Sequence, residues 1–188
     1  VPLTLGVAPT IDVVSNGVLS VNKPITGAFG VTKTSGGQLS LLATNTFTGP
    51  LTALGGILSV TNDLSLGAVP GTPVAGDLVL NGATLLAGTS LTINSNRGIA
   101  VGPTSGSGVG TFDVLGGVTL TYRGTITDHG TGGGLAKLHL GTLVLSSSNS
   151  YGGPTLIKNG GLTLEVTQST SPTNNIIPPT SALTLGGE

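Results

Sequence analysis

The stretch Thr44-Asn45-Thr46-Phe47-Thr48-Gly49-Pro50 returns 104 residues later as Ser148-Asn149-Ser150-Tyr151-Gly152-Gly153-Pro154. Both copies hold a small hydroxyl residue, Asn, a second small hydroxyl residue, an aromatic residue, a glycine-bearing turn and Pro. Each copy lies between two short runs of alternating apolar residues. A pattern that returns with its flanks intact indicates an internal repeat, and long repeats of this kind are typical of solenoids.

The composition favours an all-β chain and excludes several classes of function. Glycine accounts for 33 of 188 residues, charged residues for 7% and aromatic residues for 3%, with no Cys, Met or Trp. Zero Cys excludes disulfides and thiol chemistry. The net charge of −1, with its few basic residues scattered, gives no basis for nucleic-acid binding. No run is long enough to insert into a membrane.

Short strand patterns follow one another roughly every ten residues, separated by turn residues. Helical spacing is nearly absent. Closed sandwiches and barrels have no reason to keep repeating, whereas a parallel β-helix stacks one coil on the last. Coils of roughly 20 residues predict about nine coils and a stack of about 40–45 Å. We expect inward ladders at Leu39/Leu41, Leu58/Val60 and Leu78/Leu80.

We expect one continuous β-solenoid over residues 1–188, divided into unequal repeat units. The echo of Leu3 at Leu78 and Leu183 predicts a short unit at 3–77, a long unit at 78–182 and the start of a third at 183–188. A chain that begins at Val1 and ends inside a repeat is expected to be a piece of a longer protein. The end coils are open edges, so we expect them to stack end to end on another copy or on flanking repeats of the same chain.

Residues Gly30–Val60 and Gly134–Glu165 resemble the autotransporter-associated β-strand repeat, also called the passenger-associated transport repeat. The similarity lies in a lysine-bearing strand, a Gly-x-Leu-x-Leu strand, the Asn-x-aromatic-x-Gly turn and a glycine pair before a second strand. It implies a right-handed parallel β-helix in a very large secreted bacterial protein, extracellular or on the cell surface. The segment Lys137-Leu138-His139-Leu140 departs from the usual link after the lysine, which predicts a local change of surface.

The repeated turn is interpreted as a structural corner of the coil. Its side chains recur once per repeat between two strands, and asparagine in a turn commonly bonds to the backbone. The aromatic residues could stack on sugars, but covering the core at a corner is the favoured interpretation. The predicted corner residues are Asn45, Phe47, Gly49, Pro50, Asn149, Tyr151, Gly153 and Pro154.

Other reactive side chains give no recognisable catalytic, cofactor or metal pattern. Asp12 and Asp113 are taken as equivalent strand positions in different repeats, without a partner for acid–base work. The group of Asp128, His129 and His139 matches no usual zinc spacing. Gly106–Gly110 precedes no helix, so it is no phosphate cradle. The serines Ser146, Ser147 and Ser148 have no His or acid nearby in sequence to activate them.

We therefore expect no enzyme and no cofactor, and three functional classes stay open. The first is a structural segment of a large surface fibre, stalk or filament. The second is an adhesin that binds a glycan or host surface along the solenoid side, through the aromatic turn and the loops around Arg97, Arg123 and His129. The third and weakest is a polysaccharide-degrading enzyme, which needs clustered acids in a groove.

Overall fold

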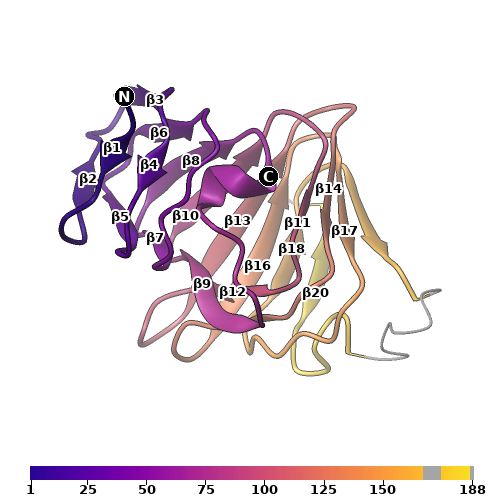
Figure 1. The fold of residues 1–188 in the computed structure, drawn as a ribbon. Coiled ribbons are helices and arrows are strands. Elements are labelled where there is room, and N and C mark those ends of the chain that lie inside the picture. The colour runs from indigo at the N-terminus through magenta and orange to yellow at the C-terminus, as the bar shows by residue number, and fades with distance from the viewer. Residues whose placement is uncertain (167–174, 187–188) are drawn as a thin grey trace.

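A computed structural model describes residues 1–166 and 175–186 and shows a parallel β-helix with three faces (Figure 1). Every strand pair among the described residues is parallel. Parallel pairing fits the sequence because each short strand leads through a turn to the next face and returns one coil higher. The all-β solenoid expected from the sequence is confirmed.

Face 1 is a six-stranded sheet and face 2 an eight-stranded sheet. In chain order, face 1 holds β2 (Thr10–Asp12), β5 (Val31–Thr34), β7 (Leu51–Ala53), β9 (Val74–Leu80), β12 (Arg97–Val101) and β15 (Ile126–Asp128). Face 2 holds β3 (Val18–Val21), β6 (Gln38–Leu41), β8 (Gly56–Val60), β10 (Ala83–Ala87), β13 (Gly108–Val114), β16 (Gly133–Leu138), β18 (Thr155–Ile157) and β20 (Leu183–Leu185).

Face 3 changes character along the stack. It begins with a two-stranded sheet, β1 (Leu3–Thr4) and β4 (Ile25–Thr26), and ends with a four-stranded sheet. The latter holds β11 (Leu91–Ile93), β14 (Thr119–Tyr122), β17 (Thr142–Leu145) and β19 (Gly161–Leu164). Between the two sheets lie the turn at 44–48 and the 3-10 helix η1 (Asp63–Leu66), joined to each other by the Asn45 N–H to Leu64 C=O bond of 2.9 Å.

The core is a set of apolar ladders inside the coil. The six residues expected to point inward, Leu39, Leu41, Leu58, Val60, Leu78 and Leu80, are all at most 1% exposed. They alternate with outward residues, as the period of two in a strand requires. One cluster of buried side chains runs from Leu5 to Ile176. The stacked coils therefore share one continuous core.

The coils are fewer and longer than the sequence predicted. Gln38 pairs with Ile57 after 19 residues, but Gly56 pairs with Ala83 after 27. Eight strands on face 2 make seven coil steps, or a stack of about 34 Å, in place of about nine coils. The estimate was too high because loops at some corners, such as 67–73, lengthen a coil without adding a strand to the stack.

Echoes in the sequence do not always mark equivalent places in the coil. Leu3, Leu78 and Leu183 lie in three different sheets, on faces 3, 1 and 2. The unit boundaries at 3–77, 78–182 and 183–188 therefore stay a prediction, and residues 187–188 lie outside the described part. The two lysine-bearing strands differ likewise: β5 lies on face 1 and β16 on face 2. The second copy of the repeat is thus rotated by one face relative to the first.

Candidate functional site: the repeat corners

Asn45 joins three successive coils at the first corner. Its Oδ1 accepts a hydrogen bond from the Ile25 N–H, at 2.8 Å, in the coil before. Its Nδ2 donates to the Ser65 carbonyl, at 2.6 Å, in the coil after. The side chain is 1% exposed. A buried amide with both ends paired satisfies backbone groups that the turn would otherwise leave without partners.

Asn149 repeats this arrangement on another face. Its Oδ1 accepts from the Ile126 N–H at 2.7 Å, and its Nδ2 donates to the Ile176 carbonyl at 2.6 Å. The first copy stacks on β4 of face 3, whereas this copy stacks on β15 of face 1. The same three-coil bridge therefore forms wherever the turn falls around the solenoid.

The aromatic residues of the two turns are core residues. Phe47 is 1% exposed and Tyr151 is fully buried. The Tyr151 hydroxyl lies 2.7 Å from Thr155 Oγ1, which lies 2.8 Å from Ser181 Oγ. Burial raises the pKa of Tyr151, and the hydroxyl hydrogen bonds oppose this only in part. Neither ring presents a surface on which a sugar could stack.

The glycines of the turns allow neighbouring coils to approach closely. A Cβ added to Gly49 would lie 2.2 Å from the backbone nitrogen of Gly30 in the coil below. A Cβ added to Gly153 would lie 2.7 Å from the carbonyl carbon of Gly133. Real side chains do not approach backbone atoms this closely, so the position requires a residue without a Cβ.

The prolines that follow these glycines start the next strand. The Pro50 carbonyl accepts from the Val31 N–H at 3.0 Å, and the Pro154 carbonyl accepts from the Leu135 N–H at 2.8 Å. Proline has no N–H of its own to leave unpaired at the point where the chain enters the strand. The turn therefore ends in a residue that continues the parallel ladder through its carbonyl alone.

Lys33 is a buried ammonium group at the corner between faces 1 and 2. Its side chain is fully buried, and Nζ donates to the carbonyls of Thr34 (3.3 Å), Ser35 (2.9 Å) and Gly55 (2.9 Å). The first two belong to its own coil and the third to the next. Three carbonyls match the three donors of an ammonium. Desolvation lowers the pKa of Lys33, and the Asp12 charge opposes that effect.

Lys137 is held in the same way one face further round. Nζ donates to the carbonyls of Leu138 (2.7 Å), His139 (2.8 Å) and Asn159 (3.3 Å). His139 has a left-handed backbone, φ 56°, as Ser35 has in the first copy with φ 62°. That conformation is uncommon for residues other than glycine. In both copies the carbonyl of the left-handed residue is a ligand of the ammonium, which stabilises the turn.

Arg97 forms a buried polar cluster that sequence reasoning missed. It was expected in a surface loop, but its side chain is 1% exposed. Nε lies 2.9 Å from Asp63 Oδ1 and Nη1 lies 3.0 Å from Asp77 Oδ2. Nη2 donates to the Gly67 carbonyl at 2.6 Å, and the Tyr122 hydroxyl donates to the Arg97 carbonyl at 2.6 Å.

The cluster lies where face 3 changes from the 3-10 helix η1 to strand β11. Burial raises the pKa of Asp77 while the Arg97 guanidinium lowers it, and burial raises the pKa of Tyr122. The Arg97–Asp63 spacing of 34 residues follows no repeat offset. A strand-initial arginine in a nearly charge-free chain is the one signal in the sequence that could have suggested a buried role.

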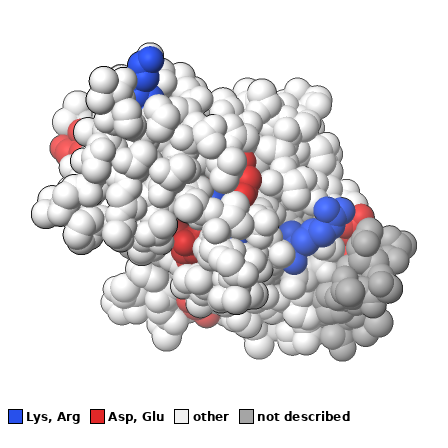
Figure 2. Space-filling view, in the orientation of Figure 1, with Lys and Arg blue, Asp and Glu red and all other residues white. Residues whose placement is uncertain are grey.

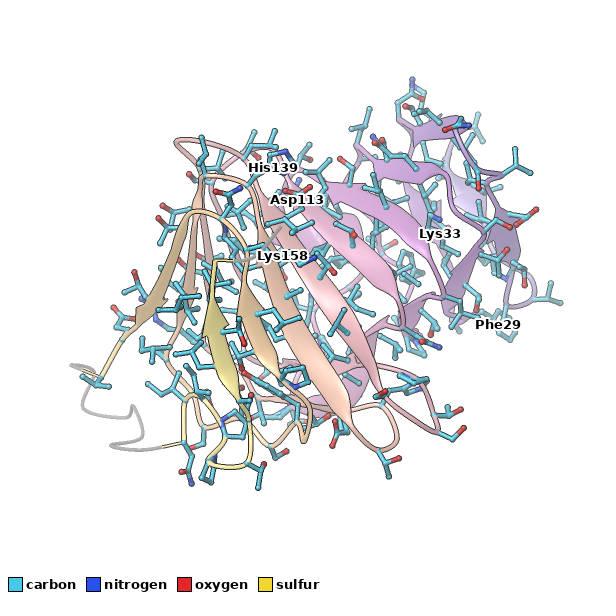
Figure 3. All side chains as sticks on the ribbon, turned by 180° about the vertical axis from the view of Figure 1, so that it is seen from behind. Phe29, Lys33, Asp113, His139 and Lys158 are labelled. Carbon is cyan, nitrogen blue, oxygen red and sulfur yellow. The ribbon has the colours of Figure 1, made fainter. Side chains whose placement is uncertain are left out.

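Asp12 and Asp113 occupy equivalent strand positions in the two repeats, one face apart. Asp12 lies on face 1 opposite Thr34, the residue after Lys33, and Asp113 lies on face 2 opposite Leu138, the residue after Lys137. Asp12 is exposed, and hydrogen bonds from Ser35 and Thr34 lower its pKa. Asp113 pairs through Oδ1 with Nδ1 of His139, a side chain 58% exposed. Figure 3 shows this pair on the outside of face 2, with Lys158 beside it.

The remaining candidates are dispersed. Arg123 Nη2 lies 3.1 Å from Glu165 Oε2 at the surface. The Asp128 carboxylate accepts from the Gly152 N–H at 3.0 Å, which ties it to the second corner. Gly106–Gly110 leads into β13, and Ser146 is buried. Within the described residues, no group of three or more His, Cys, Asp or Glu side chains is placed to hold a metal ion.

Comparison with known proteins agrees with this architecture. The family described as passenger-associated-transport-repeat matches residues 31–60 and 135–166. The adhesin BmaC autotransporter of Brucella suis biovar 1 (strain 1330) is 33% identical over 160 residues, which is 85% of this chain. The chain spans 4% of the length of that relative. No solved structure matches the chain.

The matched segments contain the features described above. Residues 31–60 hold Lys33, Asn45 and Phe47, and residues 135–166 hold Lys137, Asn149 and Tyr151. No helix in the described part is long and apolar enough to cross a membrane. The chain is a surface or extracellular passenger segment, and it belongs to the proteins that carry passenger-associated transport repeats.

Proposed function

We propose that this segment is a structural part of a long surface fibre or stalk, in which stacked coils supply length. The observation that carries the proposal is a core that continues to both ends of the described solenoid. Leu19 of β3 is 41% exposed and Leu185 of β20 is 72% exposed. Strands β3 and β20 each pair on one side only. Apolar, unpaired coil ends are stabilised by further coils.

The ends are proposed to stack on flanking repeats of one long chain or on another copy. Analytical ultracentrifugation of the 188-residue chain tests this over a range of concentrations. We expect concentration-dependent oligomers, which a charge at either end, Leu19→Lys or Leu185→Lys, abolishes. Leu140→Lys is the matched control, because Leu140 is 72% exposed on a corner away from the ends. A monomer at every concentration would contradict stacking between subunits.

A second candidate function is adhesion by the side of the solenoid. It is supported by the name of the relative, an adhesin autotransporter. Adherence of cells that express the full-length protein tests it, with a deletion of this segment matched by a deletion of equal length elsewhere in the passenger. Adherence that is unchanged by loss of the segment would exclude an adhesive role for this part of the chain.

Catalysis is not part of the proposal. Asp113 and His139 form the one acid–histidine pair in the described residues, and that pair lies on an outer strand face. The name of the relative describes an adhesin and mentions no enzyme activity. A panel of polysaccharide substrates tests this expectation, and release of reducing ends that depends on His139 would overturn it.

A further inference from the structure

Phe29 is the exception among the aromatic residues. The other four, Phe47, Phe112, Tyr122 and Tyr151, are at most 1% exposed, whereas Phe29 is 41% exposed. Aromatic rings bury large areas and are normally placed in cores or at interfaces. In a chain with 3% aromatic residues, an outward ring stands out. Figure 3 shows Phe29 at the rim of the solenoid, far from the Asp113–His139 pair.

Phe29 lies next to the first repeat corner. A Cβ on Gly49 would lie 2.7 Å from the Phe29 carbonyl carbon, and a Cβ on Gly30 would lie 2.2 Å from the Pro50 carbonyl oxygen. Phe29 and Pro50 therefore follow each other along one edge of the solenoid, one coil apart. The next coil adds the 67–73 loop above them, so the edge is built from three successive coils.

This edge contains a hollow of about 370 Å³. A hollow of this size falls in the usual range for small-molecule sites. Its walls combine apolar side chains, a hydroxyl and the backbone of a glycine-bearing loop; they include Thr48, Pro50, Val69, Pro70, Val74 and Asp77. The Thr48 hydroxyl is exposed and has no hydrogen-bond partner among the described residues. The hollow thus offers apolar contact and hydrogen bonds side by side.

The hollow offers no free charge. Asp77 is its one charged lining residue, and the carboxylate is paired with the buried guanidinium of Arg97 at 3.0 Å. No Lys, Arg or His lines it. Figure 2 shows few charged side chains on the face that carries η1 and β9. An anionic ligand would find no cation here, because the Arg97 donors are already occupied.

A peptide strand has no regular edge to join at this corner. Strand β7 pairs with β5 on one side and with Leu78–Leu80 of β9 on the other. Among the described residues, 74–77 of β9 have no partner strand on the β7 side, but Gly76 has a left-handed backbone (φ 67°), so they form no regular extended edge. Recognition by strand addition needs an unpaired edge. A neutral saccharide matches what the hollow offers. Its ring faces are apolar, its edges carry hydroxyls, and it has no charge.

We propose that Phe29 and the hollow behind Thr48 and Pro50 form a binding site for a neutral saccharide. The Phe29 ring packs against the C–H face of one sugar unit. Thr48 and the loop backbone bond to hydroxyls of the unit seated in the hollow. The inference rests on the adhesive role proposed above, and it moves the binding surface from the buried Phe47 and Tyr151 to Phe29.

A glycan array probed with the whole 188-residue chain tests the site. The array carries neutral hexose oligosaccharides beside their sialylated and sulfated forms. We expect binding to neutral members, with no gain from added negative charge. Phe29→Ala is expected to weaken that binding by about tenfold, as loss of one aromatic contact does. Thr48→Val is expected to weaken it without changing the apolar contact.

The control Leu140→Ala removes an exposed apolar side chain from a different corner and should leave binding unchanged. Circular dichroism and urea unfolding verify that each variant is folded. Binding to neutral glycans that survives Phe29→Ala overturns the site while the adhesive role stands. No binding to any neutral glycan, or binding to protein ligands alone, overturns the saccharide assignment even if cells still adhere through this segment.

Discussion

Replacing Asn45 by Ala should loosen three coils at once. The substitution removes the hydrogen bonds of 2.8 Å to the Ile25 N–H and 2.6 Å to the Ser65 carbonyl. Both backbone groups would then lack a partner. They would also be out of reach of water, because the Asn45 side chain that bonds to them is itself only 1% exposed. The perturbation therefore acts on coil stacking and leaves the strands themselves intact.

The magnitude follows from the two orphaned groups. Each buried polar group left without its partner costs about 1–3 kcal/mol. We expect the free energy of unfolding to fall by about 2–6 kcal/mol, a large part of the stability of an ordinary domain. Asn149→Ala should cost a similar amount, because its bonds to Ile126 and Ile176 have nearly the same lengths.

Urea unfolding followed by circular dichroism measures the loss, and amide hydrogen exchange locates it. The Ile25 amide should lose its protection in Asn45→Ala and keep it in Asn149→Ala, with the reverse for Ile126. Asn159→Ala is the matched control, since its exposed side chain should cost less than about 0.5 kcal/mol. A loss below about 1 kcal/mol in Asn45→Ala, or equal protection of Ile25 in both variants, would refute the three-coil bridge.

Three further predictions concern the other buried polar groups. Arg97→Met should cost about 3–5 kcal/mol, because two carboxylates lose their buried cation, whereas Arg123→Met at the surface should cost less than about 1 kcal/mol; similar urea midpoints for the two variants would contradict this. Lys137→Met should cost about 1–3 kcal/mol in total, because the three corner carbonyls that lose Nζ are only partly buried and can bond to water instead, against almost nothing for the exposed Lys158→Met, as thermal unfolding can measure. The pKa of Tyr122 is raised by burial above the unfolded value near 10, so its contribution to stability is complete below about pH 10 and is lost as the pH rises further. Tyr122→Phe should be less stable at neutral pH but should show a smaller fall in urea midpoint above pH 10, and parallel curves for both proteins would overturn the assignment.

The sequence predicted the fold class and the inward ladders because strands leave a local signal. Alternation at Leu39/Leu41 and Leu58/Val60 reports which side of a strand is buried, whatever lies beyond the next turn. The repeated turn predicted a corner role for Asn45 and Asn149 from their spacing and their residue type. The pattern could not say that each amide reaches the coil before and the coil after, since stacking joins residues 20 or more apart.

The Arg97 cluster and Phe29 escaped prediction for a related reason. An arginine in a loop-like stretch is typically exposed and a phenylalanine is typically buried, and the structure reverses both. Arg97 is buried because η1 and β9 bring Asp63 and Asp77 to it. Phe29 is exposed because it lies at the corner between β4 and β5, where its side chain does not enter the core that Ile25 and Val31 enter from those two strands.

By itself, the sequence determined the period of two within each strand, the glycines and asparagines at the corners, and therefore a stack of parallel coils. Only the tertiary structure decided how many coils there are and on which face each motif falls. Coil lengths of 19 and 27 residues occur side by side, so the rotation around the axis accumulates through the loops. A motif repeated after 104 residues can thus keep every local bond and still appear one face further round, as Lys33 and Lys137 do. Strand alternation is a local property of neighbouring residues. The face on which a motif falls depends instead on the summed lengths of all the loops that precede it.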